Sequence, residues 1–324
     1  MTRREIIMLL GGAVVWPVAV NAQEPGRTYR LGGLTPSPRD GPHYNALFDE
    51  LRRLGIVEGQ NLTVDWRGYG LQPEQFSEIA VELIKAKTDV IFCAGEVAVR
   101  AAQQATKTIP ILAITDDMVG SGLVRSLAQP GGNTTGVSIL GTELDGKRQD
   151  ILIEAVPGLR RLAALADANQ PRLPQYLQAL EDGARARGAE LLIYQITNSD
   201  EVLPAIDAAK ASDAAALNVL SSALLFSNRR VIIERTAALR LPAVYQWAEM
   251  AEEGGLIAYG PRIKQMFRDV ARRQLIKLFR GVKPTDLPVE LPTQFDLAIN
   301  LQTARAMGHE VPAGLVARAD DVIS

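Results

Sequence analysis

From residue 29 onward, short apolar runs alternate with longer segments whose apolar positions recur every three or four residues. The short runs have the length of buried strands, and the longer segments have the period of amphipathic helices. This alternation is typical of a parallel sheet covered by helices on both faces. In the first half we expect strands at 29–34, 61–66, 89–93, 109–114 and 133–140, and helices at 43–54, 76–87, 98–106 and 121–127.

The same order of elements restarts after residue 160. We expect strands at 161–167, 190–196, 214–220 and 243–246, and helices at 175–187, 203–211 and 229–239. Gly55 and Gly188 follow corresponding helices in the two halves, as C-terminal caps do. Beyond residue 267 we expect one long helix, a proline-punctuated run and a further helical pattern that returns to the first half.

The repeat predicts two doubly wound parallel-sheet α/β lobes. No long Gly/Ser linker separates the halves, so short crossings are expected near 140–142 and 259–261. The expected division assigns 28–141 plus about 261–300 to an N-terminal lobe and 142–260 to a C-terminal lobe. Residues 301–324 are left without a lobe.

Residues 1–22 have the pattern of a cleavable signal peptide. Arg3 and Arg4 precede an apolar stretch at 6–20, and Val20-Asn21-Ala22 offers a cleavage site. The stretch is shorter than the roughly 20 residues needed to span a bilayer, so we expect export to the periplasm without stable membrane insertion. The paired arginines resemble a twin-arginine signal, and both that route and general secretion stay open.

Composition excludes several classes of function. The 35 Lys+Arg and 37 Asp+Glu leave a net charge of −2, so no basic field exists to bind nucleic acid. Cys93 is the single cysteine, and His43 and His309 are the two histidines, which disfavours a zinc site or a histidine relay. We therefore expect no metal and no cofactor.

Ligands of open parallel sheets bind beyond the carboxyl ends of the strands. The residues there form the candidate ligand-binding set: Thr35, Ser37, Gly95, Glu96, Thr115, Asp116, Asp117, Asn169, Ser221, Ser222 and Tyr245. Glu96 suits either the positive end of a helix or competition with a ligand anion at that end. Asp116 and Asp117 suit either helix capping or a cationic group of the ligand.

Other candidates have simpler structural interpretations. The serines lack a Gly-x-Ser-x-Gly elbow, which argues against a serine hydrolase. The glycine-rich segment 131–136 precedes a strand and lacks the P-loop lysine, so a turn is favoured. Cys93 is expected to be a small buried residue, and both histidines are expected at surface or capping positions. Four aromatic residues suit either packing or stacking on a flat ligand: Tyr69, Tyr245, Trp247 and Tyr259.

Several segments resemble one protein family along nearly the whole chain. They are TRREIIMLLGG at 2–12, LGIVEGQN at 54–61, GLVRSLAQPGGNTTG at 122–136, LPAVYQW at 241–247, GGLIAYG at 254–260, KPTDLPVE at 283–290 and ARAD at 317–320. Together they are similar to the substrate-binding proteins of ABC transporters, in the tryptophan/tyrosine-type group.

The resemblance implies a type I periplasmic-binding-protein fold of the Venus-flytrap kind, with a hinge and an interlobe ligand cleft, and a role without catalysis. The protein would act as a monomer, capture a small-molecule solute in the periplasm and deliver it to an ABC permease with its ATPase. The alternative is a ligand-sensing periplasmic protein that docks to a membrane signalling receptor. A transcription regulator of the same core would need a helix-turn-helix where the signal peptide stands.

The chain departs from the family pattern at three positions of the expected cleft. Glu96 replaces a small or hydroxyl residue, Asp117-Met118-Val119 replaces Asp-Pro-Val, and Ser222 replaces an acidic residue. The expected ligand is therefore a small polar or amino-acid-like solute. Glu96, Asp116 or Asp117 would receive its cationic group.

Overall fold

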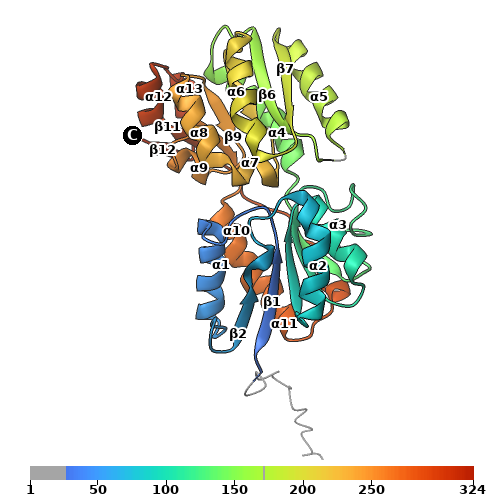
Figure 1. Ribbon diagram of the computed structural model, residues 1–324. Helices are drawn as coiled ribbons and strands as arrows, with labels where there is room; N and C mark the ends of the chain where they lie inside the picture. Colours follow the sequence, from blue (N-terminus) through green and yellow to red (C-terminus); the bar gives the residue numbers. More distant parts are fainter. Residues whose placement is uncertain (1–26, 171) are drawn as a thin grey trace, which may run out of the picture.

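The computed structural model describes residues 27–170 and 172–324, which form two lobes stacked end to end (Figure 1). The predicted signal peptide, residues 1–22, lies outside the described residues. Within the described part of the chain, no helix combines the length and apolarity needed to cross a membrane.

The first lobe is built on a five-stranded parallel sheet in the order β2-β1-β3-β4-β5. Its strands are β1 (Tyr29–Leu34), β2 (Leu62–Asp65), β3 (Val90–Ala94), β4 (Ile111–Thr115) and β5 (Thr134–Ser138). Successive side chains of a strand point to opposite faces. Accordingly, Val90 and Phe92 join one apolar cluster, whereas Ile91 and Cys93 join another on the opposite face. Cys93 is fully buried, as predicted.

Helices cover both faces of this sheet (Figure 1). One face carries α1 (Pro42–Arg53), α10 (Ile263–Val270), a π-helical segment η4 (Ala271–Leu275) and α11 (Ile276–Phe279). The other face carries α2 (Phe76–Lys85) and α3 (Glu96–Ala105). Short 3-10 turns complete the lobe at η1 (Trp66–Gly68), η2 (Pro73–Gln75) and η5 (Pro284–Asp286).

The second lobe contains a seven-stranded sheet in the order β12-β11-β10-β9-β8-β6-β7. Its strands are β6 (Arg161–Asp167), β7 (Glu190–Ile196), β8 (Leu217–Val219), β9 (Ala243–Tyr245), β10 (Ile257–Gly260), β11 (Asp296–Asn300) and β12 (Asp321–Ile323). The pairs are parallel except β10 with β11, which is antiparallel. The predicted class of two parallel-sheet α/β lobes is confirmed, with this one reversed pair added.

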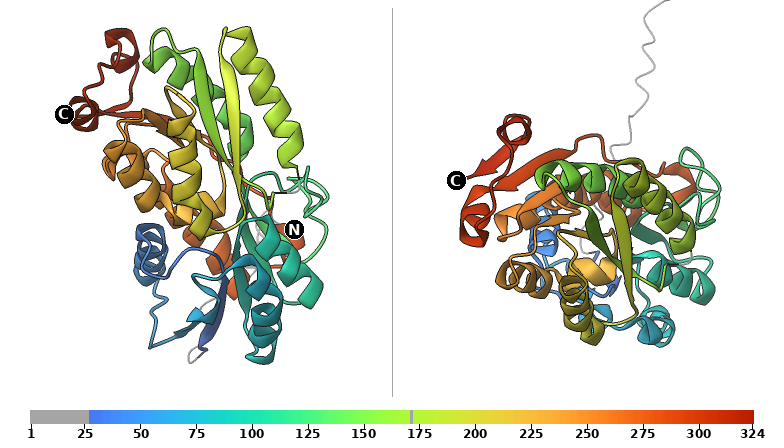
Figure 2. Two further views of the ribbon diagram at one scale, coloured as in Figure 1. Left: turned by 45° about the horizontal axis from the view of Figure 1, so that its top comes forward. Right: turned by 90° about the horizontal axis from the view of Figure 1, so that it is seen from above.

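Helices also flank the second sheet on both faces (Figure 2). Apolar side chains of α4 (Gly141–Ala155) and α5 (Leu173–Ala186) pack on one face, and those of α6 (Val202–Ala211) and α8 (Arg229–Ala238) on the other. The remaining helices are α7 (Ala223–Ser227), α9 (Glu249–Glu252), α12 (Leu301–Met307), α13 (Ala313–Val316) and the 3-10 turn η3 (Ser199–Glu201).

The chain crosses between the lobes at three places (Figure 1). Residues 139–140 connect β5 to α4, and residues 261–262 connect β10 to α10. Residues 291–295 connect β11 to Glu290, whose backbone bridges Val137 of β5. The third crossing was not expected. Residues 263–290 lie with the first lobe, but 296–300, expected there as helix, form a strand of the second sheet, and 301–324 follow it into the second lobe.

One further helix prediction was wrong, and one helix was not predicted. Residues 121–127 form turns rather than a helix, and Gly122 there has left-handed backbone with φ +67°. Residues 141–155, for which no helix was predicted, form the 15-residue helix α4. In the glycine-rich segment, residues 131–133 form an irregular bend, and residues 134–136 are the first part of β5.

Candidate ligand-binding site

A cavity of about 170 Å³ lies between the two lobes. Its wall comes from the segments that follow β1, β3 and β4 in one lobe, from those that follow β6, β8 and β9 in the other, and from α10. Because the parallel strands of both lobes end toward the same gap, side chains far apart in the sequence meet there. An apolar cavity of roughly 150 Å³ admits a benzene-sized molecule, so this one has room for a small solute.

The cavity brings together most of the residues predicted from the strand ends. Those that line it are Ser37, Gly95, Glu96, Thr115, Asp116, Asn169, Ser221 and Ser222. Thr35, Asp117 and Tyr245 lie outside the lining. Thr35 is fully buried and accepts a hydrogen bond from the Tyr44 hydroxyl at 2.9 Å, and the Tyr245 hydroxyl lies 2.8 Å from the Thr236 hydroxyl.

The first turn of α3 faces the cavity. Gly95 to Ala98 all line it, and Gly95, as N-cap, provides no capping side chain. The first backbone N–H groups of a helix have no partner within the helix and favour an anion. Glu96 does not compete for them, because its carboxylate pairs with Arg100 at 2.6 Å and accepts from the Ser121 hydroxyl at 2.8 Å. The turn is therefore a suitable place for a ligand carboxylate.

The two aspartates after β4 both contact residues of the second lobe. Asp116 accepts hydrogen bonds from the Thr142 backbone N–H at 2.9 Å and from the Thr142 hydroxyl. Burial nevertheless raises the pKa of its carboxyl. Asp117 forms an ion pair with Arg172 of the second lobe. Both groups hold the lobes together, which the sequence pattern did not indicate.

The sequence analysis missed Asp167, a carboxylate that lines the cavity at the end of β6. Its side chain is 8% exposed and accepts hydrogen bonds from the Asn169 backbone N–H at 3.0 Å and from its Nδ2 at 2.9 Å. Burial raises the pKa of this carboxyl, although the bonds from Asn169 and Ser222 oppose that change. A cationic ligand group beside Asp167 would stabilise its charged form.

A second group of lining side chains is apolar. These side chains come from α7, α10 and the segment after β9: Leu224, Phe226, Trp247, Ile263, Met266 and Phe267. The rings of Phe226 and Trp247 lie 6.0 Å apart in an edge-to-face arrangement. Of the four aromatic residues considered for stacking, Trp247 lines the cavity and Tyr69, Tyr245 and Tyr259 do not. The cavity lining thus combines polar and apolar side chains.

The expected surface or capping position of His43 was wrong. His43 is 2% exposed and packs edge-on against Phe226 of the second lobe at 5.2 Å and against Phe267 at 4.7 Å. Burial, reinforced by the charge of Arg229, lowers its pKa to about 3, so the ring is neutral at physiological pH. No hydrogen bond joins His43 to a serine among the described residues, so a histidine-activated serine nucleophile is not formed.

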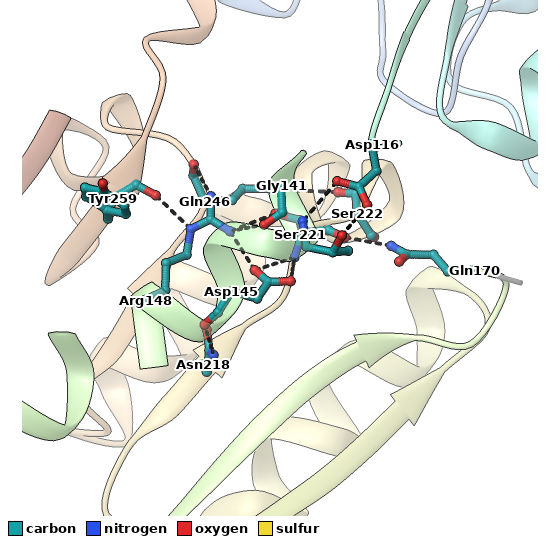
Figure 3. A network of polar contacts seen from close by, with 11 residues as sticks. Asp116, Gly141, Asp145, Arg148, Gln170, Asn218, Ser221, Ser222, Gln246 and Tyr259 are labelled. Atoms are coloured by element: carbon teal, nitrogen blue, oxygen red, sulfur yellow. Dashed lines mark hydrogen bonds and ion pairs between the residues drawn. The ribbon is translucent and has the colours of Figure 1, made fainter. Parts of the chain in front are cut away.

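Arg148 is buried next to the cavity and donates hydrogen bonds to several groups of the cavity lining (Figure 3). Its guanidinium is 1% exposed, pairs with Asp145 at 2.6 Å and donates to the Ser221 hydroxyl at 2.9 Å. It also donates to the carbonyl oxygens of Gly141, Gln246 and Tyr259. These groups lie beside two of the crossings and at the strand ends that line the cavity. The Arg148 guanidinium therefore joins residues beside two of the crossings to residues of the cavity lining in one hydrogen-bond network.

Contacts between the lobes surround the cavity. In addition to the pair of Asp117 with Arg172, a hydrogen bond of 3.1 Å joins the hydroxyls of Ser37 and Ser227. A Cβ on Gly95 would lie 3.3 Å from the Cβ of Ala223. The structure thus shows the lobes closed on one another, which is the arrangement that encloses a ligand.

Comparison with protein families gives a match over most of the chain. The family of ABC transporter substrate binding proteins matches residues 41–323. A tyrosine-binding protein of Clostridioides difficile (strain R20291) is 25% identical over 259 residues, which cover 79% of this chain and 74% of that protein.

Solved structures agree on the fold. A conserved domain protein of Vibrio cholerae is similar with a TM-score of 0.80 and 24% identity, covering 91% of this chain and 99% of that one. The ABC domain of a Streptococcus pneumoniae protein in complex with L-Trp gives a TM-score of 0.77 and 19% identity, covering 91% and 100%. A periplasmic binding protein of Burkholderia mallei has a TM-score of 0.53 and 10% identity, covering 80% of each chain.

Proposed function

The chain belongs to the ABC transporter substrate-binding protein family, and on this premise we propose that it captures an aromatic amino acid in the interlobe cavity and delivers it to an ABC permease with its ATPase. The family consists of solute-binding proteins rather than enzymes, which confirms the role without catalysis. The observation that carries the proposal is a small cavity with an anion site, a buried carboxylate and an apolar wall.

Each end of an amino acid has a matching place in this cavity. The ligand carboxylate accepts from the free backbone N–H groups in the first turn of α3, where Gly95 leaves the helix end open. The ligand ammonium pairs with Asp167, the lining carboxylate of the second lobe. Glu96 and Asp117 are not assigned this role, because their carboxylates already pair with Arg100 and Arg172. In Asp116 both carboxylate oxygens accept from Thr142, whereas both hydrogen bonds from Asn169 reach Oδ1 of Asp167.

The ligand side chain occupies the apolar wall. Phe226, Phe267 and Trp247 present ring faces and edges there, and aromatic pairs gain about 0.5–1.5 kcal/mol beyond the burial of their area. The printed names of two similar proteins, one tyrosine-binding and one in complex with L-Trp, support the same ligand class. We further propose that residues 1–22 export the chain to the periplasm and that the mature protein works there as a monomer.

Calorimetric titration with L-tyrosine, L-phenylalanine and L-tryptophan tests the proposal. The wild-type protein should bind at least one of them with a stoichiometry of one. Asp167→Asn should weaken binding at least about 30-fold, because removing one partner of a buried charge pair costs roughly 2–5 kcal/mol. The matched control is Asp182→Asn, which removes an exposed carboxylate of α5 in the same lobe.

Wild-type binding tests the proposed ligand class, and the effect of Asp167→Asn tests the position of the ligand ammonium. Wild-type protein that binds none of the three amino acids contradicts the proposed function. Asp167→Asn protein that binds as tightly as wild type places the ammonium elsewhere, whereas the Asp182→Asn protein should match the wild type in both cases.

A further inference from the structure

One helical segment of the first lobe exposes almost only positive charge. Residues 264–283 run from α10 through η4 and α11 to the turn after them, and they contain seven Lys or Arg and a single acidic residue, Asp269. None of the seven is buried, because the apolar side chains of these helices pack against the first sheet and leave the charged ones outside. We call the outer surface of residues 264–283 the basic face.

Most of this charge is not neutralised within the protein. Three of the cations have a carboxylate within 4 Å: Lys264, Arg272 and Arg273. The other four form no ion pair with another of the described residues: Arg268, Lys277, Arg280 and Lys283. A helix face turned to water usually carries both signs, as the neighbouring α1 does with its pairs Asp49–Arg52 and Glu50–Arg53. The basic face therefore keeps an excess of positive charge, although the whole chain has a net charge of −2.

The basic face ends where the N-terminal segment joins the fold. Tyr29, the first residue of β1, stacks on Phe279, the last residue of α11, with ring centroids 4.8 Å apart. Residues 1–22, the export segment of the proposed function, are therefore connected to the fold beside Arg280. Residues 23–28 span at most about 20 Å even when fully extended. Because the export segment has to reach the membrane, this connection brings the end of the basic face close to the lipid head groups.

We propose that the basic face binds the surface of an anionic phospholipid bilayer, so that the mature protein adsorbs reversibly to the membrane through α10, η4 and α11. This goes beyond ligand capture and uses only the export step of the proposed function. The contact is electrostatic, because the apolar side chains of these helices, among them Phe267 and Phe279, are buried in the core and cannot insert into lipid. Each Lys or Arg near an anionic bilayer strengthens binding about fivefold.

Co-sedimentation with phospholipid vesicles tests the proposal on the chain without residues 1–22, because the described fold begins at residue 27. In about 20 mM salt, wild-type protein should bind vesicles of equal parts phosphatidylglycerol and phosphatidylethanolamine but not vesicles of phosphatidylcholine. Salt at about 0.5 M should abolish the binding, because it shortens the screening length to below about 5 Å. The triple variant Arg268→Gln, Lys277→Gln and Arg280→Gln should bind the anionic vesicles about 100-fold more weakly, since three cations are lost.

The matched control carries Lys210→Gln, Arg230→Gln and Arg305→Gln. These exposed cations of the second lobe also form no ion pair with another of the described residues, so the change in net charge is the same and vesicle binding should equal that of wild type. Wild-type protein that does not bind the anionic vesicles in low salt, or that binds phosphatidylcholine equally well, overturns the proposal. Equal loss of binding in the two triple variants also overturns it.

The vesicle assay contains no amino acid, so it is separate from the test of ligand capture. None of the six substituted residues lines the cavity, and both triple variants should therefore bind amino acids as wild type does. Failure of wild-type protein to bind an aromatic amino acid contradicts the proposed function and leaves the lipid-binding result unaffected.

Discussion

His43 couples the stability of the protein to pH. Its pKa is lowered to about 3 by burial between the lobes and by Arg229, whereas an imidazole in the unfolded chain titrates near pH 6.5. Between these values the unfolded state binds more protons than the folded state, so stability falls as pH falls from about 6.5 toward 3. We expect this residue to reduce the free energy of unfolding by up to about 1.4 kcal/mol for each pH unit in that window.

Urea unfolding of wild-type and His43→Phe protein between neutral and mildly acidic pH measures this contribution. Phenylalanine retains a ring against Phe226 and Phe267 but has no titratable nitrogen. The free energy of unfolding should therefore fall less on acidification in His43→Phe protein than in wild type. The account of His43 is wrong if both proteins lose stability equally as the pH is lowered.

Residues that follow predicted strands make up much of the cavity lining. The sequence did not reveal which partners these residues have or whether they are buried. Ser37, Glu96 and Asp116 line the cavity because they follow parallel strands, which the sequence pattern can indicate. The pattern gave no sign of Asp167, which is the last residue of its strand. His43 was expected at a surface or capping position because it starts a helix, but packing against Phe226 of the other lobe and Phe267 of α10 buries it.

At the scale of elements, the contact between β4 and β5 depends on Gly136. Its φ is +144°, and a Cβ there would lie 1.8 Å from the carbonyl oxygen of Ala113. Gly136→Ala should therefore lower the free energy of unfolding by about 2–4 kcal/mol, from backbone strain and the displacement of a neighbouring strand.

Gly146→Ala is the control for this change. Gly146 lies within α4, and a Cβ there would meet no atom within 4 Å, so alanine should stabilise the protein by about 0.5–1 kcal/mol through its helix propensity. Urea midpoints compare the two variants with wild type. Gly136→Ala protein as stable as wild type would show that β5 can move away from β4 at no cost.

Helices and strands with apolar buried faces could be predicted from the sequence. An element whose buried face carries polar residues was missed. The strands of the first sheet were placed within a few residues, and of these β3 and β4 are apolar on both faces. Helix α4 was missed because its buried positions include Asp145, Arg148 and Gln149, which interrupt the apolar period. Asp145 and Arg148 belong to the network next to the cavity, so two of the residues that hid the helix also connect the hinge to the site.

At the scale of the whole molecule, three crossings connect two lobes that close on one cavity (Figure 1). The third crossing could not be anticipated, because the apolar residues 297–299 fit a helix or a strand equally well and their pairing with β10 is decided by the tertiary fold. Ion pairing of Asp117 with Arg172 and packing of His43 on Phe226 join the lobes on two sides of the cavity. Closure of this kind encloses a ligand and presents a new outer surface to a partner.

Native mass spectrometry of the protein incubated with an equimolar mixture of the standard L-amino acids tests the central claim most directly. The claim is that the closed cavity holds one amino acid with an aromatic side chain. We predict a single 1:1 complex whose added mass is that of an aromatic amino acid. A protein that remains unliganded in the mixture, or that selects a charged or aliphatic amino acid, would contradict the account.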